Sequence, residues 1–397
     1  MRLSSRATVL FPRILVAIFA IAMPMALYAE SMAEQVMPAE RPIDITDESY
    51  ETGVVTDIFR VIDDDYAGYE HKTQKVKVRI ESGKHKGEEF DMDNGILNDR
   101  ADMYLSRGQK IVVNRMEKSD GSVKYLMRDR YRIPALIWLA IIFVIFSALT
   151  GGIRGLTSIF GLVVSVLILV KGVIPAIVAG QSPLLVCLVG AYLIAVTSLY
   201  LAHGFHKRTS IALLSTCITL GLSAILAVIF VQTAQLFGMG SEESMFLQTG
   251  QFANIDLRGL LLGGIIIGAL GVLDDITTAQ TAAIDEISKA NPAMTFAQLY
   301  ASGMSVGREH IASLINTLAL AYVGASLPLL LLFQEGGDMP TWMIINGEFI
   351  AEEIIRTLVG SSALLLAVPI STWFAATLLR NRTGKVQKSE GHHGHHH

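Results

Sequence analysis

Cysteine is scarce in this sequence. Only Cys187 and Cys217 occur among 397 residues, and both lie inside apolar segments. This scarcity excludes a disulfide framework or a thiolate metal site in the polar parts of the chain. Charged residues are also few, at 17%, whereas hydrophobic residues make up 51% and occur in long blocks. The composition therefore indicates a membrane protein and not an ordinary soluble enzyme.

Signals of several other functions are lacking too. The sequence contains no H-E-x-x-H zinc motif and no P-loop. The formal net charge is -4, and most charged residues lie before residue 133, in short loops or in the tail. This distribution gives no indication of a nucleic-acid surface. We therefore expect no enzyme activity, no cofactor and no nucleic-acid partner.

Residues 1–29 have the pattern of an export signal. Arg2 and Arg6 precede an apolar stretch, and Ala29 is a small residue suited to a cleavage site. Arg13 interrupts the apolar stretch, so a cleaved signal peptide and a retained signal anchor both stay open. Either alternative places the following segment outside the cytoplasm. Residues 30–49 are expected to be a linker.

Residues 50–132 differ in character from the rest of the chain. Short alternating runs such as "QKVKVRIE" and "QKIVVNRME" are separated by Gly, Asp and Asn turns. This pattern predicts about five short strands, with a more helical segment between the third and fourth, as in a small OB-like β-barrel. Because spaced aromatic residues are missing, a module for contacts between subunits or with an envelope partner is favoured over a nucleic-acid or sugar platform.

Residues 133–380 contain the long apolar blocks. Each is close to the ~20 residues that cross ~30 Å of hydrocarbon. We predict about seven spans, at 133–150, 156–178, 182–203, 209–234, 257–279, 310–333 and 354–379. The expected fold is thus mainly α, a polytopic membrane helix bundle that follows an N-terminal signal or anchor helix and a small extracytoplasmic β-barrel domain.

The charges of the loops predict the orientation of the bundle. Arg154, the 203–208 loop and Arg308 fall on one side of the predicted spans, with the basic tail at 381–397. Positive charge favours the cytoplasmic side, which places the β domain outside and the C-terminus inside a bacterial plasma membrane. The tail also ends in "GHHGHHH", which is either an expression tag or a native metal-sensing segment.

Two adjacent carboxylates, Asp274 and Asp275, follow the apolar run of the fifth span. A carboxylate at this depth costs ~2.5–3.5 kcal/mol or more, so it is expected to face the bundle interior, a partner or water. Oxygen ligands suit protons or hard cations, which makes the pair a candidate metal or proton site. The alternative is that the span ends near Gly271 and leaves the pair in a cytoplasmic vestibule.

Other polar residues are candidates for the same site. Thr278 follows Asp274 at four-residue spacing on one helix face. Asn316 and Thr317 lie at a comparable depth in the sixth span, and Ser361 lies toward the middle of the seventh. Arg308 is either an ion-pair partner for an aspartate or an ordinary cation at a cytoplasmic helix end.

The segments "GGIIIGALGVLDDITTAQTAAIDEI" and "SGMSVGRE", with the apolar run after them, resemble the bacterial YibE/F family of multispanning membrane proteins. The resemblance implies an exported β domain followed by about this number of spans. The adjacent aspartates depart from the family pattern, in which a single acidic residue is common, so the equivalent residue is not assigned. The resemblance implies an architecture but no activity.

Three functions compete at this point. The first is a permease or channel for an ion or small polar solute that uses Asp274 or Asp275. The second is a non-transporting envelope scaffold, homo-oligomeric or bound to a partner through its β domain. The third is an intramembrane aspartyl hydrolase, which is disfavoured because adjacent positions on one helix point ~100° apart.

Overall fold

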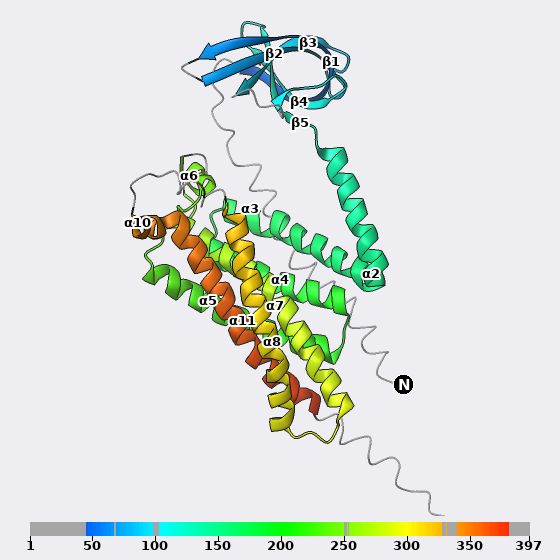
Figure 1. Ribbon diagram of the computed structural model, residues 1–397, viewed down its shortest axis with the longest axis vertical. Coiled ribbons are helices and arrows are strands. Elements are labelled where there is room, and N and C mark those ends of the chain that lie inside the picture. Colours follow the sequence, from blue (N-terminus) through cyan, green and yellow to red (C-terminus); the bar gives the residue numbers. More distant parts are fainter. Residues whose placement is uncertain are drawn as a thin grey trace, which may run out of the picture. The chain divides into compact units, whose positions relative to one another are not determined.

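The computed structural model describes residues 45–66, 69–97, 103–249, 252, 254–327, 331 and 340–380. The predicted signal or anchor at 1–29, most of the predicted linker and the tail at 381–397 lie outside the described residues. The chain divides into two compact units, which meet in the sequence between Phe146 and Ser147. We describe each unit by itself (Figure 1).

The first unit is a curved antiparallel sheet of five strands in the order β3-β2-β1-β4-β5. Its strands are β1 (Ile45–Tyr66), β2 (Tyr69–Ile80), β3 (Glu89–Leu97), β4 (Lys110–Lys118) and β5 (Val123–Arg130). With 22 residues, β1 is long enough to pair with β4 along its first half and with β2 along its second. It begins at Ile45, five residues before the predicted start of the domain.

Alternating side chains build the core of this unit. Val55 of β1, Val76 and Val78 of β2, and Ile111 and Val113 of β4 are all buried and face the same side of the sheet. Two irregularities in the pairing of β1 with β2 interrupt the register, and such bulges increase the curvature of a strand. The sheet is therefore a half-barrel that encloses an apolar interior.

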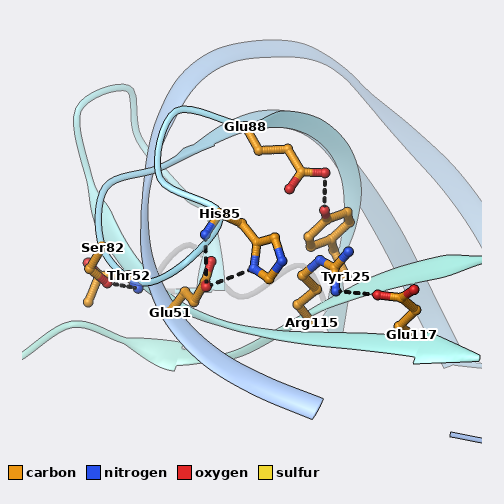
Figure 2. Close-up of polar contacts among 8 residues, drawn as sticks. All are labelled: Glu51, Thr52, Ser82, His85, Glu88, Arg115, Glu117 and Tyr125. Carbon is orange, nitrogen blue, oxygen red and sulfur yellow. Dashed lines mark hydrogen bonds and ion pairs between the residues drawn. The ribbon is translucent and has the colours of Figure 1, made fainter. Parts of the chain in front are cut away.

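Side chains connect the two edge strands of the half-barrel. Phe90 next to the start of β3 stacks on Tyr125 of β5, with ring centroids 3.8 Å apart. The Tyr125 hydroxyl also donates a hydrogen bond of 2.5 Å to Glu88 (Figure 2). Burial, with a contribution from Glu88, raises the pKa of Tyr125 above its ordinary value. The strand order together with these contacts brings the edges of the curved sheet toward each other.

Two buried charged side chains belong to the half-barrel: Figure 2 shows Arg115 beside Tyr125, and Glu51 against His85. The Glu51 carboxylate, whose side chain is only 3% exposed, lies 2.9 Å from Nδ1 of His85. Its second oxygen, Oε2, is buried without a hydrogen-bond partner. Arg115, which is also buried, donates to Glu117 at 2.9 Å. His85 is thus the side chain that partners Glu51 in this cluster.

We expect the change His85→Ala to destabilise the half-barrel by about 2–4 kcal/mol, because it leaves the buried Glu51 carboxylate without its imidazole partner. Hydrogen exchange of the β1 and β4 amides in the full-length protein measures this loss. The matched control is Arg107→Ala, which breaks an exposed ion pair with Asp57 and should leave exchange unchanged. Equal exchange rates in the two variants would contradict the prediction.

The second unit is helical. Its elements, starting with the helix that crosses from the first unit, are α2 (Ile133–Ile168), the π-helical turn η2 (Leu169–Val173), α3 (Ile174–Val178), α4 (Pro183–His203), α5 (Lys207–Thr233), α6 (Glu242–Thr249), α7 (Leu257–Ala290), α8 (Phe296–Ala325), α10 (Thr341–Asn346) and α11 (Glu348–Arg380). In the described part of the chain, five helical segments are long and apolar enough to cross a membrane. They are 133–178 and the helices α4, α5, α7 and α11.

The count of seven predicted spans differs from these five at two places. The predicted spans at 133–150 and 156–178 form one helical run, which is kinked at Gly152, where φ is 58°. Glycine tolerates this positive φ because it has no Cβ. The predicted span at 310–333 belongs to α8, which starts earlier, at Phe296, and whose described part ends at Ala325. The number of spans stays a prediction.

Helix α7 is the central helix of the bundle, in contact with α4, α5, α8 and α11 (Figure 1). Close packing depends on small residues at the crossings. A Cβ at Gly263 would lie 2.5 Å from the sulfur of Cys187 on α4, and a Cβ at Gly307 of α8 would lie 2.3 Å from Val368 of α11. Small residues at such crossings allow helices to approach closely within a membrane. This packing sets the faces of α7 that carry polar groups.

Candidate functional site

Asp274 lies on α7 and faces α4. Its Oδ2 accepts a hydrogen bond of 2.6 Å from the Ser198 hydroxyl, and its Oδ1 is buried without a partner. Among the described residues, Asp274 takes part in no ion pair. A carboxylate with one hydroxyl donor and no cation is an expensive group inside a membrane protein, and such groups mark functional sites by default.

Asp275 has different surroundings. It is exposed on α7 and interacts electrostatically with His203, which ends α4. The two carboxylates therefore diverge, as expected for neighbouring helix positions ~100° apart. Within the described ranges, no three His, Cys, Asp or Glu side chains come together in a way that could hold a metal ion. Asp274 and Asp275 are thus two separate positions, and the structure does not bring them together around one point.

A column of polar side chains continues along α7 from Asp274. Thr277 shares a hydrogen bond of 2.7 Å with Thr216 of α5. The hydroxyls of Thr278 and Thr281 are buried and have no partner. Gln280 donates from Nε2 to the Gly303 carbonyl at 2.6 Å, while its Oε1 is unpartnered. Because buried polar groups are usually satisfied, a concentration of unpartnered oxygens within two turns is unusual.

Another face of α7 is open. Gly264, Gly268, Gly271 and Asp275 are all exposed although the helix is central to the bundle. Their spacing of four, three and four residues places them on one side of the helix. A Cβ at Gly271 would meet nothing within 4 Å. Glycines here therefore leave a shallow open surface on α7, and Asp275 is the charged group on it.

Two pockets lie toward opposite ends of α7. The first, of about 380 Å³, includes Gly264 together with Glu352, Glu353 and Arg356. The second, of about 490 Å³, includes Asp285 of α7 and His203, the neighbour of Asp275. The 21 residues from Gly264 to Asp285 span ~32 Å of helix, close to the ~30 Å thickness of a bilayer core. The two pockets are thus separated by about one membrane thickness.

The wall of the first pocket is anchored by carboxylates. Oε1 of Glu348 accepts hydrogen bonds from the backbone N–H groups of Phe237, Gly238 and Met239, at 2.6, 2.8 and 3.2 Å. Glu352 accepts another from Gly240 at 2.8 Å. These bonds fix the loop after α5 to the beginning of α11.

The remaining predicted residues are placed as follows. Thr278 belongs to the polar column, whereas Ser361 is half-buried on α11. Asn316 and Thr317 lie on an exposed face of α8, and the Thr317 hydroxyl bonds to the Ser313 carbonyl of its own helix. The structure therefore does not bring Asn316 or Thr317 to Asp274.

Arg308 does not neutralise an aspartate in this structure. Its Nε donates to the carbonyl of Met304 on the same helix, at 3.3 Å. Sequence reasoning missed Ser198, Gln280 and Thr372, which donate or accept bonds inside the bundle. Polar residues within apolar spans were the available signal for all three.

A G-x-S-x-G pattern at Gly303, Ser305 and Gly307 is a packing feature here. Ser305 is exposed in the middle of α8, whereas a hydrolase nucleophile of this motif sits at a sharp strand-to-helix turn. A Cβ on either glycine would collide with side chains of α7 or α11. The pattern therefore gives no support to a hydrolase.

The apolar helices make this chain a multi-pass membrane protein that carries a β half-barrel before its bundle. The model of the YibE/F-like protein family matches residues 139–381, which is more than half of the chain. The protein belongs to this family, as its sequence motifs predict. No curated protein and no solved structure matches the chain.

Proposed function

We propose that this protein is a permease or channel for an ion or small polar solute, with a pathway along the open face of α7. The observation that carries the proposal is the exposed face of α7 formed by Gly264, Gly268, Gly271 and Asp275. It begins at the first pocket and runs toward the end of the helix that contributes Asp285 to the second. A charged carboxylate is too costly to face lipid. The exposure of Asp275 is explained if its face of α7 lines a polar path. A rearrangement of the helices or a second copy of the chain would close that path toward the lipid.

The two aspartates have separate roles in this proposal. Asp275, on the open face beside His203, is the residue that a cation, a proton or a polar solute meets on its way. Asp274 is a buried carboxylate beside the polar column, and a passing cation or proton would stabilise its negative charge. Gly271, where an added Cβ would meet nothing within 4 Å, gives room for the solute.

The setting of this pathway is also part of the proposal. The strand order and the edge contacts of the first unit support an OB-like barrel, with β1 paired to both β2 and β4. The basic groups at one end of the bundle support a cytoplasmic location for that end in a bacterial inner membrane. The β unit is then extracytoplasmic and available to an envelope partner or to a second copy.

We expect purified protein in liposomes to conduct at least one of five probes: protons, K⁺, Mg²⁺, chloride or phosphate. Asp275→Asn should slow that flux by about tenfold or more, because it removes the charge on the open face. The matched control is Glu286→Gln on the same helix, an exposed carboxylate paired with Lys289. Absence of flux for all five probes would reject the proposal and favour a non-transporting scaffold.

A further inference from the structure

The pocket at the basic end of the bundle is built from four parts of the chain. Arg154 and Thr157 come from α2, His203 ends α4, Lys207 and Arg208 begin α5, and Asp285 comes from α7. Its volume of about 490 Å³ lies within the range of ~300–1,000 Å³ typical of small-molecule sites. The pocket therefore has the size of a ligand site.

Positive charge dominates this pocket. Neither Arg154 nor Arg208 has an ion-pair partner among the described residues, and both interact electrostatically with His203. Asp285 is the one acidic group in the described lining, and it is already paired with Lys289 at 2.8 Å. Unpaired like charges held close together are destabilising unless a counter-charge is bound.

The backbone adds to this charge. Helix α5 begins at Lys207 and its N-cap His206 provides no side-chain cap. The Ser210 N–H donates to the His206 carbonyl in the first turn. A helix of 27 residues carries partial positive charge at this end. The uncapped N–H groups thus reinforce the guanidinium groups that converge from α2 and α5.

We infer that this pocket binds a phosphate group, either on the head of an anionic phospholipid or as free phosphate. Guanidinium groups form bidentate hydrogen bonds with phosphate oxygens, and basic pockets between membrane helices favour anionic head groups. The inference does not rest on transport, because binding is measured without flux.

The test compares the variant Arg154→Gln/Arg208→Gln with the matched control Arg308→Gln. Arg308 on α8 is a cation that does not line the pocket, and its Nε bonds to the Met304 carbonyl of its own helix. Native mass spectrometry of the full chain in detergent measures retention of phosphatidylglycerol against phosphatidylcholine. Equilibrium dialysis measures inorganic phosphate, with chloride at equal ionic strength as reference.

The double variant should retain phosphatidylglycerol or phosphate about tenfold less than wild type and control. Binding of phosphatidylglycerol alone identifies the lipid head group as the ligand, and binding of phosphate alone identifies the free anion. Equal retention by all three proteins overturns the inference. If the double variant does not fold, the test uses the melting temperature of the wild type. The inference is also overturned if neither phosphatidylglycerol nor phosphate raises that temperature above its value in chloride.

Discussion

Replacing Gly271 by leucine is expected to slow transport strongly while leaving the fold intact. A Cβ at this position meets no atom within 4 Å, so the new side chain projects from the open face of α7 into free space. Leucine also favours the helix over glycine by up to about 1 kcal/mol. The melting temperature should therefore be unchanged or higher, while flux in liposomes falls by about tenfold or more because the path is obstructed.

The comparison variant is Gly307→Leu, which places the same side chain at a closed position. A Cβ there would lie 2.3 Å from Val368, so we expect a loss of about 1–3 kcal/mol or more from overpacking. A melting temperature that falls in both variants would show that the face of Gly271 is covered in the membrane. Normal flux through Gly271→Leu would place the pathway elsewhere.

Asp274→Asn is expected to change stability and transport in opposite directions. Asparagine keeps an acceptor for the Ser198 hydroxyl and removes the negative charge of a carboxylate whose Oδ1 has no partner. The free energy of unfolding should therefore rise by about 1–3 kcal/mol, as measured by SDS titration in detergent. Flux should fall by about tenfold or more if the charge serves the passing solute. Stability lost at a functional site is a common trade-off.

Ser198→Ala is the matched control for this prediction. It removes the donor to Asp274 and keeps the carboxylate, so the free energy of unfolding should fall by about 1–3 kcal/mol. A fall in stability for Asp274→Asn as well would indicate that the carboxylate is structural. That result would support the scaffold and contradict the proposed role of Asp274.

The sequence could predict where helices and strands lie better than which side of each helix packs against its neighbours. Long apolar blocks and alternating runs are local signals, and they predict the long helices and the strands that the structure has. The kink at Gly152 was harder to anticipate, because one glycine pair reads equally well as a loop or as a bend within one helix. The start of α8 at Phe296 was harder to anticipate because Arg308 and Glu309 separate its first turns from the long apolar run.

The depth of a residue along its helix can be read from the sequence, whereas the rotation of the helix about its axis cannot. Asn316 and Asp274 lie at comparable depth by residue count, yet Asn316 points to an exposed face. Rotation of α8 about its axis is set by Gly303 and Gly307 packing against α7 and α11, a contact between segments distant in sequence. The contact of Asp274 with Ser198 likewise joins segments 76 residues apart, so it could not be read from the local sequence.

The hydrogen bonds from residues 237–240 to Glu348 and Glu352 have a mechanical consequence. Because four consecutive amides are tethered to the first turns of α11, that loop cannot swing aside alone as a hinged flap. Widening the pocket beside it requires the whole of α11 to tilt or slide together with the loop. Such a movement would reach Thr372 toward the other end of α11 and its hydrogen bond from Gln280 of α7.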